Sequence, residues 1–147
     1  MNRLTNIFLL TLLCGCQTPP MPLIDLSEAG WAERSGQALW QRPGAPRMAV
    51  DVHFAKRGEI SWLQLSKGGL PLATVTLTAN TWELNGSMFG RKARGRGDSP
   101  GRASPAQLAR ALGGRMGGHG WEAQWTSVAF ILAHQHSGER WMVYLEP

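Results

Sequence analysis

Alternation of apolar and polar residues marks residues 48–55 as the clearest strand of the chain. Its apolar side chains recur at every second position: Met48, Val50, Val52 and Phe54. This period of two is typical of a strand with one buried face. The following segment, 59–66, also predicts a strand, but its apolar residues fall on both faces, with Ile60 and Trp62 on one and Leu63 and Leu65 on the other. Such a strand needs cover on both faces. We therefore expect a helix on one side and a ligand or a neighbour on the other.

Further strands are expected on both sides of this pair, over residues 37–41, 70–79, 81–84, 127–135 and 140–146. Asn85-Gly86 is a favoured two-residue hairpin turn, and a turn there would pair Trp82 with Phe89. Residues 25–34 predict a short helix with Trp31 on its inner face, although Gly30 and Gly36 weaken it. The pattern as a whole predicts a mostly β (α+β) domain, built as an antiparallel meander.

One helix is indicated before the last strands. Ser104 is a suitable N-cap, Pro105 suits the first helical position, and Gly113 supplies the stop. Leu108, Ala111 and Leu112 share one face of this segment. The helix can therefore cover one face of the predicted sheet.

The chain opens with a short positive segment and an apolar stretch over residues 7–13. A membrane-spanning helix needs about 20 apolar residues, so this stretch fits a secretory signal peptide instead. Leu13-Cys14-Gly15-Cys16 resembles the bacterial lipobox. The resemblance implies cleavage after Gly15, a diacylglyceryl group on Cys16, and N-acylation of Cys16 with a fatty acid such as palmitate. An ordinary cleaved signal with incidental cysteines is the alternative.

The lipobox resemblance divides the chain into a signal peptide (1–15), a lipidated cysteine with a Pro-rich tether (16–24) and a single β-rich domain (25–147). In a Gram-negative host, Gln17 after the lipidated cysteine favours the outer membrane, with the domain facing the periplasm. The chain has two cysteines, Cys14 and Cys16. Removal of the first and acylation of the second would leave no free thiol, which excludes disulfides and cysteine metal sites.

Positive charge is concentrated in one segment, residues 91–102. The whole chain has a net charge of +5, and this segment contributes Arg91, Lys92, Arg94, Arg96 and Arg102 against Asp98 alone. Glycine and arginine without aromatic residues predict a flexible loop. Outside the cytoplasm such a loop can bind lipid headgroups or acidic partners, since polybasic segments gain about 1 kcal/mol per residue at an anionic surface. A loop that only maintains solubility is the alternative, and no nucleic-acid partner is expected.

The sequence offers few candidate metal-binding or catalytic residues. If Ser137-Gly138 is a two-residue turn, His136 faces Glu139 and His134 lies on the same face, which is a conceivable metal site. Polar residues at an exposed strand end are the simpler interpretation, and we expect no metal and no other cofactor. The sequence lacks the Gly-x-Ser-x-Gly motif of serine hydrolases and shows no paired carboxylates among apolar residues. We therefore expect a protein that is not an enzyme.

Residues 62–84, with Trp-x-Gln-Leu, Gly-Leu-Pro-Leu and Thr-Val-Thr-Leu, and residues 103–113, which end in Leu-Gly, resemble the LolA/LolB-like lipoproteins. The resemblance implies an open half-barrel or curved sheet whose concave face holds acyl chains. The chain is shorter than a typical LolB, and only the lipobox cysteine is carried over as a functional residue.

The expected function is to bind or transfer an amphiphile, either a lipid or an acylated protein, at the outer membrane. The candidate cavity residues are Val50, Val52, Phe54, Trp62, Leu72, Trp82 and Phe89. The candidate headgroup contacts are Arg91, Lys92, Arg94 and Arg96. The alternative is a non-catalytic accessory subunit of a cell-envelope assembly, which docks a protein partner through its sheet edge and basic loop.

Overall fold

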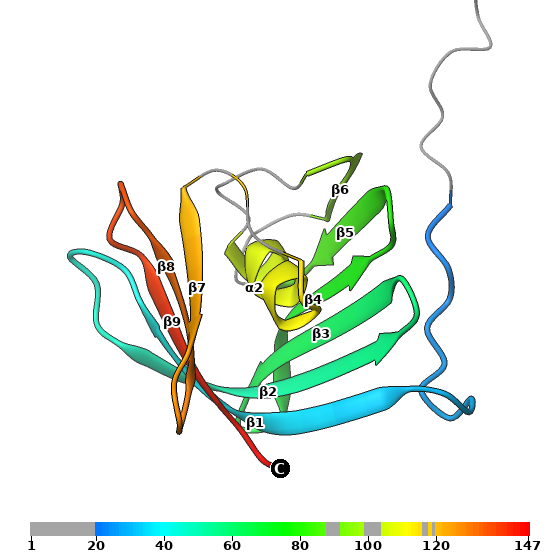
Figure 1. Ribbon diagram of the computed structural model, residues 1–147, viewed down its shortest axis with the longest axis horizontal. Helices are drawn as coiled ribbons and strands as arrows, with labels where there is room; N and C mark the ends of the chain where they lie inside the picture. Colours follow the sequence, from blue (N-terminus) through cyan, green and yellow to red (C-terminus); the bar gives the residue numbers. More distant parts are fainter. Residues whose placement is uncertain (1–19, 88–91, 99–103, 116–117, 119) are drawn as a thin grey trace, which may run out of the picture.

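A computed structural model describes residues 20–87, 92–98, 104–115, 118 and 120–147, and within them nine strands form one antiparallel sheet (Figure 1). The strands are β1 (Ala32–Gln41), β2 (Met48–Arg57), β3 (Ile60–Lys67), β4 (Leu70–Leu77), β5 (Thr81–Asn85), β6 (Ala93–Arg96), β7 (Trp121–Trp125), β8 (Phe130–His134) and β9 (Arg140–Leu145). Their order across the sheet is β6-β5-β4-β3-β2-β1-β9-β8-β7. The chain therefore runs as a meander from β1 to β6, and β9 joins the other side of β1. The predicted mostly β, antiparallel fold is confirmed.

The sheet curves around the single described helix, α2 (Ser104–Leu112), which lies on its concave side (Figure 1). The helix packs mainly against β3, β4 and β5, and the edge strand β7 keeps Trp125 58% exposed. The helix begins and ends at the predicted residues. At its end, Gly113 N–H donates to the Ala109 carbonyl, and Gly114 takes a positive φ of 81°. Leu108, the centre of its buried face, is fully excluded from solvent.

Alternation places one apolar set on the concave face of every long strand. In β3, Leu63 and Leu65 are fully buried there, whereas Ile60 and Trp62 are half-buried on the convex face. The predicted two-faced character of this strand is therefore confirmed. The helix covers the concave face of β3, as expected.

The N-terminal part of β1 corrects the sequence analysis, which expected a helix over residues 25–34. β1 begins at Ala32 and pairs with both β2 and β9. Gly36 permits this double pairing, because a Cβ at that position would lie 1.9 Å from the Tyr144 carbonyl oxygen. Trp31 does not face the core; its Nε1 donates to the Asp25 carbonyl at 2.9 Å. Gly36, which was expected to weaken a helix, is therefore the point at which β1 and β9 approach each other closely.

The hairpin expected at Asn85-Gly86 is also wrong in register. Trp82 pairs with Gly95 of β6, not with Phe89, and Phe89 and Arg91 lie outside the described residues. A Cβ on Gly95 would lie 2.9 Å from the Trp82 indole nitrogen, so the ring occupies the space that a side chain would take. Part of the basic segment is therefore an edge strand and not a loop.

The C-terminal strands agree with the sequence analysis in position and differ in length. β8 begins at Phe130, because Thr126 to Ala129 form a turn in which Thr126 N–H donates to the Ala129 carbonyl at 2.8 Å. β7 was not expected, since it follows a glycine-rich connection that hides its strand pattern. It forms one free edge of the sheet and β6 forms the other.

Candidate binding cavity on the concave face

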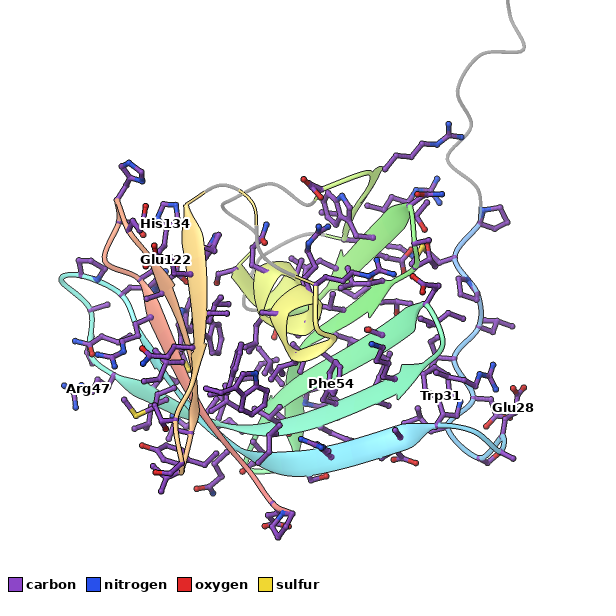
Figure 2. The ribbon with its side chains drawn as sticks, in the orientation of Figure 1. Glu28, Trp31, Arg47, Phe54, Glu122 and His134 are labelled. Carbon is purple, nitrogen blue, oxygen red and sulfur yellow. The ribbon has the colours of Figure 1, made fainter. Side chains whose placement is uncertain are left out.

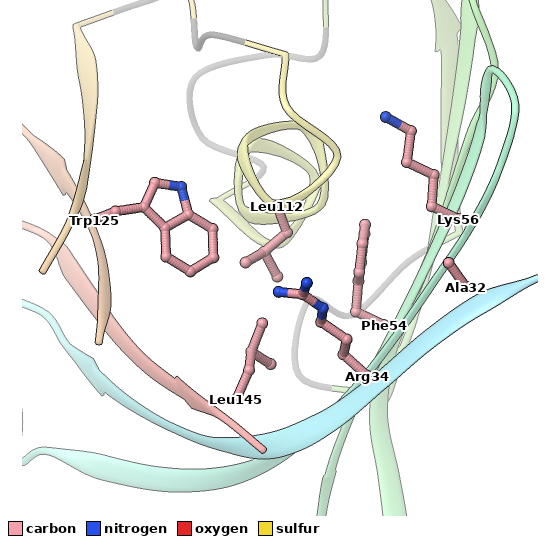
Figure 3. Close-up of a pocket in the computed structure, with 7 residues that line it drawn as sticks. All are labelled: Ala32, Arg34, Phe54, Lys56, Leu112, Trp125 and Leu145. Carbon is pink, nitrogen blue, oxygen red and sulfur yellow. The ribbon is translucent and has the colours of Figure 1, made fainter. Parts of the chain in front are cut away.

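A cavity of about 210 Å³ opens on the concave side of the sheet, between the C-terminal end of α2 and the edge strand β7 (Figure 3). Five structural elements contribute to its lining: Ala32 and Arg34 from β1, Phe54 and Lys56 from β2, Leu112 from α2, Trp125 from β7 and Leu145 from β9. Most of this surface is apolar. The cavity therefore lies where the helix stops covering the sheet.

Strand register explains how these side chains meet. Arg34 lies opposite Phe54, and Gly36 opposite Leu145, so alternate residues of three neighbouring strands point to the same side. Phe54 is 5% exposed and forms the inner wall of the cavity. Trp125 is 58% exposed and stands at its mouth on the opposite side (Figure 3). The cavity thus has a buried wall and an accessible aromatic side chain at its entrance.

A second cavity of about 280 Å³ adjoins the first and shares Arg34, Trp125 and Leu145 with it. Its other lining residues come from the β7–β8 turn and the ends of β8 and β9: Thr126, Ser127, Val128, Ala129, Phe130, Val143, Glu146 and Pro147. Sites for small molecules have volumes of about 300–1000 Å³ and are mostly apolar with a few polar groups. The two adjoining cavities together reach that range.

Two cations lie at the edge of the first cavity, and none of its seven lining residues is acidic. Arg34 is exposed on the concave side of β1. The Lys56 ammonium donates to the Gly113 carbonyl at 2.6 Å, so it also satisfies an acceptor at the helix C-terminus. An apolar cavity with cations at its entrance suits a molecule with an apolar chain and an anionic end.

The predicted cavity residues are distributed over both faces of the sheet. Val50, Val52, Phe54 and Trp82 are buried on the concave side, but only Phe54 lines the cavity. Leu72 is half-buried at an irregularity in the β3–β4 register. Trp62 lies on the convex face, where its ring meets the edge of His53 at 5.2 Å. The structure thus separates Trp62 from Trp82, which the sequence analysis assigned to one cavity.

The residues predicted to contact a headgroup also lie outside the cavity. Lys92 precedes β6, and Arg94 and Arg96 lie within it, all three exposed. β6 is the edge strand on the far side of the helix-covered strands, so these side chains do not line the cavity. The cavity cations Arg34 and Lys56 were not predicted. Lys56 follows Phe54 by two positions and could have been found from alternation, whereas Arg34 lies in the segment assigned to a helix.

The histidine hairpin does not form the conceivable metal site. The β8–β9 register pairs Ala133 with Arg140, so the connection is longer than a two-residue turn. Glu139 accepts a hydrogen bond from Trp40 Nε1 at 2.6 Å, and Ser137 N–H donates to His134 Nδ1 at 3.1 Å. Within the described residues, no group of three His, Cys, Asp or Glu side chains could hold a metal ion.

Comparison of the chain with protein-family models gives no match, and neither does comparison with curated protein sequences. In the part of the chain that the structure describes, no helix is long and apolar enough to cross a bilayer.

Proposed function

We propose that this protein is a lipoprotein, anchored to the outer membrane through Cys16, that binds the acyl chain of an amphiphile in the concave cavity. The observation that supports the proposal best is the open apolar cavity between Phe54 and Trp125, with Arg34 and Lys56 at its edge. A LolA/LolB-like half-barrel would hold its ligand on the same face of the sheet.

Burial of apolar surface supplies the driving force. Each square ångström removed from water contributes about 25 cal/mol, so covering the exposed Trp125 ring and the neighbouring leucines with an acyl chain is favourable. Because the cavity is open, a ligand that binds there displaces only solvent. Binding and release can then occur without unfolding of the sheet.

The two cations give the ligand a direction. An anionic carboxylate or phosphate at the mouth would lie beside Arg34 and Lys56 while the chain extends toward Phe54. Because both cations are exposed, solvent and salt screen the attraction, and its contribution is smaller than that of the apolar contacts. The proposed ligand class is therefore an anionic amphiphile with at least one acyl chain.

Photo-crosslinking tests the proposal directly. The full chain, expressed with its own leader and reconstituted in vesicles, is exposed to a fatty acid that carries a diazirine on its chain. We expect crosslinks on Phe54, Leu112 and Trp125, mapped by peptide mass spectrometry. Trp125→Ala should reduce the crosslinked fraction several-fold, because the mouth loses its largest apolar contact.

Tyr144→Ala is the matched control, since Tyr144 is also an exposed aromatic residue but lies on the convex face of β9. Equal loss in both variants, or crosslinks spread over the convex face, would contradict an acyl-chain cavity. Recovery of a crosslinked protein in place of the lipid would favour the alternative, an accessory subunit that docks a protein partner.

A further inference from the structure

The segment from residue 20 to Trp31 lies along the ends of the strands (Figure 1). At its C-terminal end, the Arg57 guanidinium lies 4.8 Å from the centre of the Trp31 ring and pairs with Glu28. At its N-terminal end, the Thr81 hydroxyl contacts the Met21 sulfur at 3.2 Å. The segment therefore extends from the β2–β3 corner to the β4–β5 turn.

Local hydrogen bonds shape this path. Asp25 accepts from both the hydroxyl and the backbone N–H of Ser27, at 2.6 and 2.9 Å, and its own carbonyl accepts from Trp31 Nε1. The Ser27 hydroxyl, and then its backbone N–H, hold the pKa of Asp25 below its ordinary value. Figure 2 shows Glu28 and Trp31 together at this end of the sheet, with Arg47 at the other. The tether thus leaves the domain at one defined corner.

That corner adjoins the edge strand β6. Thr81, which contacts Met21, pairs with Arg96 across β5 and β6, and Gly97 N–H donates to the Asn80 carbonyl at 2.8 Å. Cys16 precedes Met21 by five residues, and an extended chain spans at most about 3.6 Å per residue. A lipid on Cys16 therefore lies within about 18 Å of Met21.

Basic side chains of β6 and the residue before it form what we call the basic edge: Lys92, Arg94 and Arg96. All three are exposed, and Lys92 pairs with Glu83 at 3.4 Å. Positive charges on an edge strand also prevent pairing with other sheets. A lipid anchor at the tether exit would in addition keep them close to lipid headgroups.

We infer that the basic edge is the membrane-facing surface of the domain and binds anionic phospholipid headgroups. This inference rests on the proposed lipid anchor at Cys16. It fixes the orientation of the cavity as well, since Ala32, Arg34 and Lys56 lie at the same end of the strands as the tether. The mouth of the cavity would then open beside the membrane from which an amphiphile comes.

Headgroup quenching measures this orientation. The full chain is expressed with its own leader, labelled with a fluorophore at Asn80→Cys, and reconstituted in vesicles that contain a nitroxide-headgroup lipid. A second sample is labelled at Ser137→Cys, in the β8–β9 loop at the opposite strand end. In vesicles of phosphatidylcholine with phosphatidylglycerol we expect strong quenching at position 80 and little at position 137. In phosphatidylcholine alone the difference should largely disappear.

Charge removal is the second arm of the experiment. Each basic residue close to an anionic surface favours contact about fivefold, so Arg94→Gln with Arg96→Gln should lower the ratio of docked to undocked domain about 30-fold. Arg47→Gln with Arg140→Gln removes the same charge from exposed residues at the opposite strand end and should leave quenching unchanged. Equal effects of the two double variants would overturn the inference.

Failure of the inference and failure of the proposed function are distinguishable. Equal quenching at positions 80 and 137 in a protein whose Cys16 carries the lipid mass overturns only the orientation. An unmodified Cys16 overturns both the anchor and the orientation. Loss of cavity crosslinking with normal quenching overturns acyl-chain binding alone.

Discussion

The two halves of the sheet differ in what covers their concave face. In the helix-covered half, formed by β3, β4 and β5, the inward residues Leu63, Leu65 and Val75 are fully buried beneath α2. In the open half, formed by β1 and β7–β9, Trp125 is 58% exposed and two cavities remain. Both halves have the same alternation of residue types. Phe130, Leu132 and Val143 of the open half are as buried as the residues beneath the helix, so the two halves differ only at the cavity end, which the nine-residue helix leaves unfilled.

Polar contacts fix the helix to its own half. Arg115, just after the helix, donates to the Thr78 carbonyl at 2.6 Å and pairs with Glu59 at 2.7 Å. Arg110 pairs with Asp98, beyond the end of β6, at 2.6 Å. These contacts connect the end of α2 to three separate turns of the covered half. These contacts hold the end of the helix on the side of β3, β4 and β5.

The open half is nevertheless well packed at one end. The Trp40 and Trp141 rings stack with their centres 5.0 Å apart and an angle of 7° between their planes, and Trp141 is fully buried. Aromatic pairs of this kind stabilise by about 0.5–1.5 kcal/mol beyond their buried area. The open half is therefore closely packed at the strand end opposite the cavity.

Truncation of two leucines on α2 should give the largest difference between the halves. Leu108 is fully buried against the covered half, so Leu108→Ala should lower the free energy of unfolding by about 3 kcal/mol. Leu112 is half-buried at the cavity, where a void already exists, and Leu112→Ala should lower it by about 1 kcal/mol. Urea denaturation followed by tryptophan fluorescence measures both. Equal losses would show that the cavity is closed in solution.

Charge at the cavity mouth should give an intermediate effect, on binding and not on stability. Arg34→Gln should reduce crosslinking by the photoreactive fatty acid about twofold at low salt, because an anionic end loses one of its two exposed cations. Crosslinking by the corresponding fatty alcohol should not change, since it has no charge to lose. The same substitution at exposed Arg42, outside the cavity, is the control. A parallel fall for acid and alcohol would assign Arg34 a purely structural role.

The covered half and the adjoining strand β2 were the more predictable from sequence. Alternation in 48–55 and 59–66, together with the Ser104, Pro105 and Gly113 signals, predicted β2, β3 and α2 nearly to their ends. These signals are local, and each comes from a few neighbouring residues. The closed core of this half follows directly from them.

The open half and the sheet edges depend on contacts between distant residues. β1 was partly missed because Gly36 reads locally as a helix breaker, and its role is visible only when Tyr144 of β9 lies against it. β6 was missed because Gly95 is needed to accommodate the Trp82 ring, a contact that no local pattern reveals. The cavity joins five elements and could not be assembled from any one of them.

The β4–β5 turn and the β7–β8 turn have equivalent hydrogen bonds and allow a comparison of the two halves at single residues. In the covered half, Thr78 Oγ1 accepts from Thr81 N–H at 3.0 Å and pairs with the buried Thr81 hydroxyl at 2.6 Å. In the open half, Thr126 Oγ1 accepts from Ala129 N–H at 2.9 Å. Both turns close with a threonine N–H that donates to the carbonyl three residues later. The two turns share these hydrogen bonds, but only the turn of the covered half adds a second hydroxyl, that of Thr81, where the other turn has Ala129.

Thr78→Val and Thr126→Val should therefore give a small but unequal loss of stability. Each substitution keeps the side-chain shape and removes the hydroxyl. Removal at position 78 leaves the buried Thr81 hydroxyl with the Met21 sulfur, a weak acceptor, and the free energy of unfolding should fall by about 1–2 kcal/mol. Thr126 is exposed, so water can replace its hydroxyl, and the fall should be about 0.5 kcal/mol. Urea denaturation of the two variants, measured side by side, checks the difference. A larger loss at Thr126 would mean that the β7–β8 turn is covered in solution, and the open half would then not be open.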